Sequence, residues 1–233
     1  MLDDDRFNAR LFFPRDDATE PPPHATDTFV GDWHVRRHTL KPAAPTLLLF
    51  HGNGEVVSDY DDLARAYADA GANLTVADFP GYGRSRGEPT LRAVIEGAHA
   101  VFDAVRPDVV MGRSLGSACA NELLSRAVPT VLESGFVDVV ALIRRRGLDV
   151  PPEFQPGAPF DPLPKLRAAR GRLLVLHGAE DTLILPREAE AAHAAAVSAD
   201  RRLVLIEGRG HNDVSLSPVY WQTLATFIAG RAP

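Results

Sequence analysis

Three side chains of this 233-residue chain have the types that nucleophilic acyl transfer needs, a hydroxyl, an imidazole and a carboxylate. Ser114 lies in Gly112-Arg-Ser-Leu-Gly116, Asp181 ends His177-Gly-Ala-Glu-Asp181, and His211 ends Glu207-Gly-Arg-Gly-His211. A serine hydroxyl becomes a strong nucleophile when an imidazole takes its proton and a carboxylate orients that imidazole. We therefore predict Ser114 as nucleophile, His211 as general base and Asp181 as the acid that orients the base.

The pattern Gly-x-Ser-x-Gly occurs twice, around Ser85 and around Ser114. Ser114 directly follows an apolar strand-like run and directly precedes a helix-like segment with small residues. On such a sharp turn a Cβ at the flanking positions would clash, so glycine is needed there. Ser85 instead lies in residues 80–89, a loop rich in glycine and proline. We expect Ser85 to be an ordinary loop residue.

Apolar runs that alternate with helix-like segments predict an α/β architecture. The expected strands are Ala9–Phe13, Phe29–Thr39, Thr46–Phe50, Asn73–Phe79, Asp108–Met111, Thr130–Glu133, Arg172–Leu176 and Arg202–Ile206. The expected helices are Ser58–Ala70, Pro89–Val105, Leu115–Ala127, Val137–Gly147, Pro186–Ser198 and Ser217–Ala229. Continuously apolar strands indicate a parallel sheet covered on both faces. No helix separates the first two strands, so we expect them to pair antiparallel.

Asp181 and His211 each follow a predicted strand, and open α/β sheets place their sites at the carboxyl ends of strands. Glu133 ends another strand and is a reserve candidate for the acid. Glu180 is expected to be a solvent-facing charge. His51 and His177 each precede a glycine, and we expect both to fix loops by hydrogen bonds rather than to act as the base.

Acyl transfer also needs two backbone N–H groups that point at the developing oxyanion. One should be the N–H of Leu115, directly after the nucleophile. The other should come from residues 51–55, where Gly52 and Gly54 permit the bend that aims the N–H of Asn53 inward. The glycine spacing does not fit a dinucleotide-binding fingerprint.

Composition excludes several other classes. The net charge is −6, and an acidic chain argues against a nucleic-acid partner. Cys119 is the single cysteine, which excludes a cysteine-rich zinc site, and its alanine neighbours predict a buried small side chain. No signal peptide and no apolar run long enough to span a membrane are found, so we expect a cytoplasmic protein.

The sequence resembles the α/β-hydrolase superfamily from about Thr46 to its end. The matching blocks are His51-Gly-Asn-Gly, Asp78-Phe-Pro-Gly-Tyr-Gly-Arg-Ser85, Gly112-Arg-Ser-Leu-Gly-Ser117, His177-Gly-Ala-Glu-Asp181 and Gly210-His211. The resemblance implies a mainly parallel eight-stranded sheet flanked by helices, and the chain order Ser, Asp, His agrees with it. We expect one domain over residues 1–233, with a short cap at about 134–171.

The expected reaction is cleavage of a carboxylic ester with a small or medium acyl chain, through an acyl-enzyme on Ser114 and without metal or cofactor. Phe136, Leu142, Phe154 and Phe160 give the expected cap an apolar character. Residues 144–146 are three arginines that would suit a substrate carboxylate or phosphate, although such a run is usually a solvated face. A thioester or a peptide would use the same groups. A ligand-binding protein on a hydrolase fold, or a purely structural domain, is the other alternative.

Overall fold

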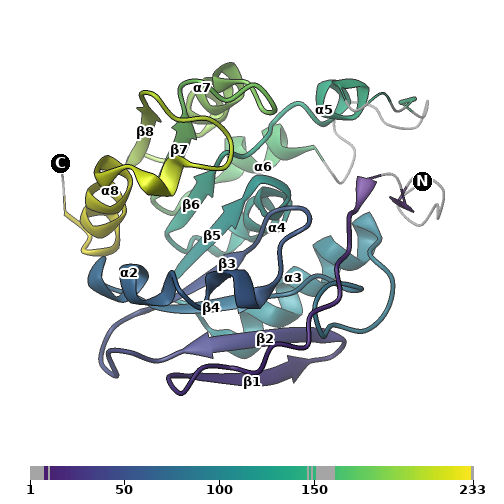
Figure 1. Ribbon diagram of the computed structural model, residues 1–233. Helices are drawn as coiled ribbons and strands as arrows, with labels where there is room; N and C mark the ends of the chain where they lie inside the picture. The colour runs from purple at the N-terminus through teal and green to yellow at the C-terminus, as the bar shows by residue number, and fades with distance from the viewer. Residues whose placement is uncertain (1–7, 10, 146, 148, 151–160, 232–233) are drawn as a thin grey trace.

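The computed structural model describes residues 8–9, 11–145, 147, 149–150 and 161–231. These residues form an eight-stranded sheet with the strand order β1-β2-β4-β3-β5-β6-β7-β8 (Figure 1). The strands are β1 Ala25–Val30, β2 Trp33–His38, β3 Thr46–Phe50, β4 Asn73–Ala77, β5 Val109–Arg113, β6 Thr130–Glu133, β7 Leu173–Gly178 and β8 Arg201–Ile206.

The sheet is parallel from β4 to β8, and in the described residues β2 pairs antiparallel with both of its neighbours, β1 and β4. The carboxyl ends of β3, β5, β6, β7 and β8 therefore lie along one edge. Helices cover both faces of the sheet, as described below. The predicted fold class, a mainly parallel eight-stranded sheet flanked by helices, is confirmed.

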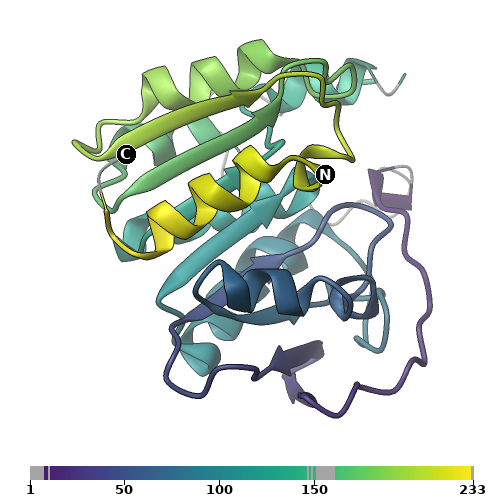
Figure 2. The same cartoon turned by 60° about the vertical axis from the view of Figure 1, so that its left-hand side comes forward.

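The described helices are α2 Ala64–Asp69, α3 Leu91–Val105, α4 Ser117–Glu122, α5 Val139–Arg145, α6 Pro162–Ala168, α7 Pro186–Ala195 and α8 Pro218–Ile228. Because successive strand residues point to opposite faces, β3 gives Leu48 and Phe50 to one core cluster and Leu47 and Leu49 to another. The first cluster also contains apolar residues of α3, α4, α6 and α7. The second contains those of α2 and α8, which Figure 2 shows on the same face.

The strand predicted over Ala9–Phe13 is wrong. Residues 8, 9 and 11 have helical backbone, and the Phe12 N–H donates to the Asn8 carbonyl at 2.9 Å. Apolar Leu11 and Phe12 are buried, as in a strand, so composition alone did not separate the two states. The antiparallel pair is instead β1 with β2, joined by a two-residue turn in which Gly31 has φ +58°.

The helix expected over Val137–Gly147 is observed as α5, whereas α6 was not expected. Its two prolines sit in the first turn, where their missing N–H groups are not needed, and the Asp161 side chain caps the helix by accepting from the Leu163 N–H at 3.0 Å. Arg146, Phe154 and Phe160 lie outside the described residues. In the described part of the chain, no helix has the length and apolar character required to cross a bilayer.

Candidate active site

Ser114 occupies a sharp turn between β5 and α4. Its φ of +49° lies in the left-handed region that side chains other than glycine rarely adopt. A Cβ on Gly116 would come within 1.9 Å of the Phe50 carbonyl oxygen, and one on Gly112 within 2.4 Å of the Gly116 carbonyl oxygen. The two glycines therefore allow the turn to pack against β3, and the packed turn holds Ser114 in this strained conformation.

The structure brings Ser114, His211 and Asp181 into contact. The Nε2 atom of His211 lies 3.0 Å from the Ser114 Oγ, and its Nδ1 atom lies 2.7 Å from the Asp181 Oδ2. The three residues follow β5, β8 and β7, whose carboxyl ends share one edge of the sheet. With Nδ1 protonated toward the carboxylate, Nε2 is free to accept the serine proton.

Asp181 is held ionised by several donors. Its Oδ1 accepts from the N–H groups of Leu183 and Ile184, each at 2.9 Å, and His177 Nε2 lies 3.2 Å from its Oδ2. Burial alone would raise the pKa of Asp181, but the hydrogen bonds from two imidazoles and the Ile184 N–H hold that pKa well below its usual range. A buried carboxylate that keeps its charge can stabilise a positive charge on His211.

The alternative candidates have other partners. The Glu133 carboxylate accepts from the Tyr220 hydroxyl at 2.7 Å and pairs with Arg113, while Glu180 is exposed. Ser85 Oγ donates to the Asp78 carbonyl and accepts from the His34 N–H, so it is a loop residue as predicted. His51 Nδ1 bonds to the Gly52 carbonyl at 2.8 Å, which confirms the prediction that it fixes a loop.

His177 also fixes a loop as predicted, since its Nε2 atom bonds to the Ile184 carbonyl at 2.7 Å. Cys119 is buried in the core, and burial raises the pKa of its thiol well above the usual value. It therefore behaves as the small buried side chain that its neighbours predicted.

Asn53 lies in the loop after β3, and Leu115 directly follows Ser114; both line the pocket beside Ser114. The Asn53 side chain is fixed, because its Oδ1 accepts from the Phe13 N–H and the Tyr82 hydroxyl and its Nδ2 donates to the Leu11 carbonyl at 2.7 Å. Leu115 is the second residue of a 3₁₀ turn, and the first N–H groups of a helical segment have no partner within it.

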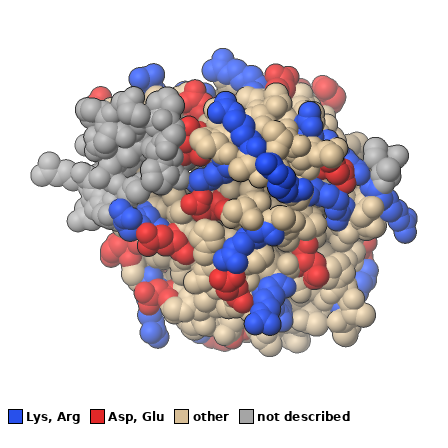
Figure 3. Space-filling view, turned by 180° about the vertical axis from the view of Figure 1, so that it is seen from behind, with Lys and Arg blue, Asp and Glu red and all other residues tan. Residues whose placement is uncertain are grey.

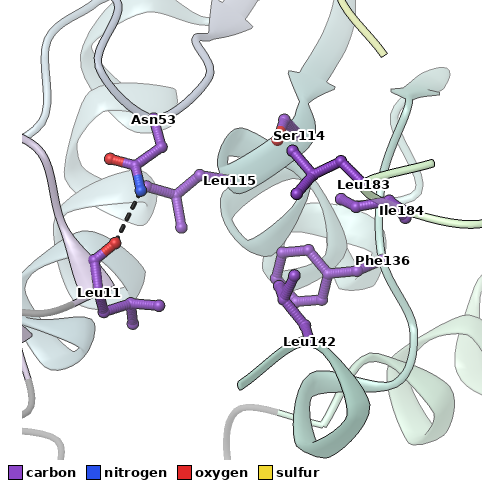
Figure 4. Close-up of a pocket in the computed structure, with 8 residues that line it drawn as sticks. All are labelled: Leu11, Asn53, Ser114, Leu115, Phe136, Leu142, Leu183 and Ile184. Atoms are coloured by element: carbon purple, nitrogen blue, oxygen red, sulfur yellow. Dashed lines mark hydrogen bonds between the residues drawn. The ribbon is translucent and has the colours of Figure 1, made fainter. Parts of the chain in front are cut away.

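A pocket opens beside Ser114 (Figure 4). Asn53 and Leu11 lie on one side, and the hydrophobic side chains on the other side are Phe136, Leu142, Leu183 and Ile184. Phe136 and Leu142 come from the segment predicted as a cap, which the sequence had marked by its apolar residues. The contributions of Leu11 and the 183–184 pair had no signal in the sequence.

A partly buried ionic cluster directly beside Ser114 was also missed. Arg113 contacts Glu55 and Glu133, which lie 58 and 20 residues away in the sequence, and Asn212. The available signal was that these groups all lie at or just after strand ends. Among the described residues, no three His, Cys, Asp or Glu side chains are grouped so that they could hold a metal ion.

Comparisons with known sequences give several matches. A family model described as serine aminopeptidase, S33, matches residues 41–150. Alpha/beta hydrolase domain-containing protein 17C of Mus musculus is 29% identical over 206 residues, which are 81% of this chain and 61% of that protein. The Xenopus laevis protein of the same name is 29% identical over 225 residues, 88% of this chain and 68% of its own length. The chain thus spans about three-fifths of the length of its mouse relative.

Solved structures share the fold. An esterase of Pyrococcus furiosus superposes with a TM-score of 0.73 at 16% identity, over 94% of this chain and 98% of its own. A monoacylglycerol lipase of Paleococcus ferrophilus superposes with a TM-score of 0.60 at 15% identity, over 79% of this chain and 94% of its own. The strand order and the structural neighbours show that the chain has the α/β-hydrolase fold, and most of its length is similar in sequence to α/β-hydrolase domain proteins.

Proposed function

We propose that the protein is a serine hydrolase that cleaves a carboxylic ester of small or medium acyl chain. The observation that carries the proposal is the continuous hydrogen-bond chain from Ser114 Oγ through His211 to Asp181, with distances of 3.0 and 2.7 Å. An imidazole held between a hydroxyl and a buried carboxylate is the arrangement that activates a serine for attack on a carbonyl carbon.

The reaction then runs in two halves. As Ser114 Oγ attacks the carbonyl carbon, His211 Nε2 takes its proton, and the ionised Asp181 stabilises the resulting imidazolium. The N–H groups of Leu115 and Asn53 bind the oxyanion. His211 returns the proton to the leaving alkoxide, which departs as an alcohol. Water, deprotonated by His211, attacks the acyl-enzyme and releases the acid and free Ser114.

The pocket supports an apolar acyl group. Its hydrophobic wall of Phe136, Leu142, Leu183 and Ile184 lies beside Ser114 and offers an aliphatic chain no charged partner. The structural neighbours named an esterase and a monoacylglycerol lipase also favour an ester. Segment 134–171 remains our proposed cap over this pocket, within a single domain of residues 1–233.

A peptidase is the second candidate, because a family model described as serine aminopeptidase matches residues 41–150. Peptide cleavage needs the same attack but a protonated amine as leaving group. An aminopeptidase must also recognise a free α-amino group, and the groups that line the described pocket include no carboxylate for it. This observation ranks the ester ahead of the peptide.

The test combines covalent labelling with turnover. A fluorophosphonate probe should label the protein and not Ser114→Ala, whose kcat on 4-nitrophenyl esters should fall by about 10⁴-fold or more. Ser85→Ala, in the other Gly-x-Ser-x-Gly, is the matched control and should keep its label. Labelling that persists in Ser114→Ala would refute the assignment.

A substrate panel separates the reaction classes. Nitrophenyl esters of graded chain length, acyl thioesters and aminoacyl amides should be compared by kcat/KM, with short and medium esters turned over fastest. Preference for the amides would identify a peptidase. A single burst without turnover on all three would identify a ligand-binding protein.

We propose that the protein acts on small acyl compounds in the cytoplasm. We also propose that it has no nucleic-acid partner, and its net charge of −6 supports this. On the face shown in Figure 3, basic side chains lie among acidic ones. A filter-binding assay with duplex DNA and with RNA should detect no retention at physiological salt.

A further inference from the structure

Arg113 is a mostly buried arginine whose side chain contacts two carboxylates and one amide. It directly precedes Ser114, and its side chain is 12% exposed. Its guanidinium contacts the Glu55 carboxylate, lies 3.2 Å from Glu133 Oε1 through Nε, and donates from Nη2 to Asn212 Oδ1 at 2.9 Å. One planar group therefore contacts three separate segments of the chain.

The first segment is the loop that holds Asn53. Glu55 accepts from the Gly52 N–H at 2.7 Å and from the Tyr60 hydroxyl at 2.7 Å, in addition to its pair with Arg113. A Cβ on Gly52 would lie 2.3 Å from Arg113 Nη1, so the guanidinium packs directly on this loop. Arg113 thereby supports the backbone on both sides of the proposed oxyanion donor.

The second segment is the loop that holds His211, because Asn212 is its next residue. The third is β6, whose Glu133 is anchored by the Tyr220 hydroxyl at 2.7 Å. Burial alone would lower the pKa of Arg113, but the charges of Glu55 and Glu133 raise it, so the guanidinium stays charged. A rigid fork with five donors can satisfy several acceptors at once, which a lysine ammonium cannot do in the same plane.

We propose that Arg113 is a positioning residue that holds the Asn53 loop and the His211 loop in register with Ser114. The inference rests on the proposed function. It adds that one guanidinium links the loop of the oxyanion donor to the loop of the base, beyond the contacts that each loop makes by itself. Displacements of about 1 Å at reacting groups can reduce a rate about 10²-fold, so such a support is expected to act on kcat.

The test uses Arg113→Ala with 4-nitrophenyl butyrate as substrate. We expect kcat to fall about 10²-fold while KM stays within about threefold, because Arg113 is not among the residues that line the pocket. Arg113→Lys should recover only part of the loss. Millimolar guanidinium chloride should restore part of the kcat of Arg113→Ala, whereas urea, a neutral molecule of the same shape, should not. Arg126→Ala is the control, because it removes a different arginine, one that pairs with Asp103 of helix α3.

A purely structural role would give a different pattern. Activity would then follow the folded fraction measured by thermal unfolding, and guanidinium would not help; this result would overturn the inference. A folded Arg113→Ala with unchanged kcat would overturn it as well. If Arg113→Ala does not fold, Asn212→Ala removes one link at an exposed residue and should lower kcat several-fold with an unchanged Tm. An unchanged kcat in that variant would refute the inference.

The two proposals fail differently. A wild-type protein that neither reacts with fluorophosphonate nor hydrolyses any ester would overturn the proposed function and this inference together. A wild-type protein that does both, with an unaffected Arg113→Ala, would overturn only the role of Arg113.

Discussion

At the scale of single residues, Asp181 is a buried carboxylate whose charge is compensated by hydrogen-bond donors. It has 2% of its surface exposed, yet the N–H groups of Leu183 and Ile184 and the imidazoles of His177 and His211 compensate its charge. The donors include the His211 imidazole, so ionised Asp181 selects the tautomer with a proton on Nδ1. The neighbouring carboxylate of Glu180 is exposed and takes no part in this arrangement.

Replacing Asp181 by asparagine should keep the shape and remove this charge. An amide that donates to Nδ1 favours the wrong tautomer, and we expect kcat for nitrophenyl esters to fall by about 10³–10⁴-fold. Fluorophosphonate labelling should slow in parallel, since the same proton transfer activates Ser114. Glu180→Gln is the matched control and should leave both rates unchanged. Equal rates for Asp181→Asn and the wild type would exclude the orienting role.

How far residues could be predicted depended on their local context. Ser114, Asp181 and His211 each follow an apolar run, so the sequence itself indicated that they would meet at one edge of a sheet. The Arg113 cluster could not be found in this way. Positions 55, 133 and 212 also lie at or after strand ends, but this signal does not show which of their side chains meet Arg113. Only the packed strand order determines which of them are adjacent.

At the scale of elements, α5 is attached to α7 through one buried side chain. The Glu188 carboxylate accepts from the N–H groups of Val137 and Asp138, at 3.2 and 3.3 Å, and pairs with Arg145 near the end of α5. The same segment carries Phe136 and Leu142 into the pocket. Glu188 therefore links the pocket wall to the sheet-bound helix α7.

Glu188→Gln should loosen this wall without changing the reacting groups. We expect KM for medium-chain esters to rise several-fold with kcat nearly unchanged, and the free energy of unfolding to fall by about 1–3 kcal/mol. Steady-state kinetics and thermal unfolding measure the two effects. Glu190→Gln alters an exposed carboxylate of the same helix and serves as control. A fall in kcat with constant KM would contradict this role.

Strands and helices could be predicted where the spacing of apolar residues fitted only one type of secondary structure. The strands from β3 onward match their predictions within one or two residues because each contains a short apolar run. The segment predicted as one strand, Phe29–Thr39, instead contains the turn between β1 and β2, since Gly31 adopts φ +58°. Helix α6 was not expected, although prolines in a first turn, after a capping aspartate, favour a helix start.

At the scale of the whole molecule, Asp78 joins the antiparallel edge of the sheet to its parallel part. Its side chain is fully buried and lies 2.9 Å from His34 Nδ1 on β2, 3.4 Å from His51 Nε2 after β3, and 2.8 Å from the Val57 N–H. Burial alone would raise the pKa of Asp78, but the hydrogen bonds from the two histidines lower it to about 2.

This lowered pKa predicts an acid-dependent loss of stability. Between pH 3.8, the ordinary pKa, and about 2, the unfolded chain binds a proton at Asp78 that the folded chain does not bind. Falling pH therefore favours unfolding in this window, and the contribution of Asp78, about 2 kcal/mol, is complete above it and lost below it. Urea unfolding at a series of pH values measures the slope.

Asp78→Asn separates this group from the other carboxylates. The variant should be less stable at neutral pH by about 3 kcal/mol, because its amide cannot satisfy both imidazoles and the Val57 N–H. Its free energy of unfolding should also fall less steeply between pH 3.8 and 2, because one titrating group is gone. Parallel curves for variant and wild type would show that Asp78 does not titrate in this window and that other carboxylates carry the acid sensitivity. A flatter curve for the variant would instead locate part of that sensitivity where β2, β3 and β4 meet, beside the loop that presents Asn53.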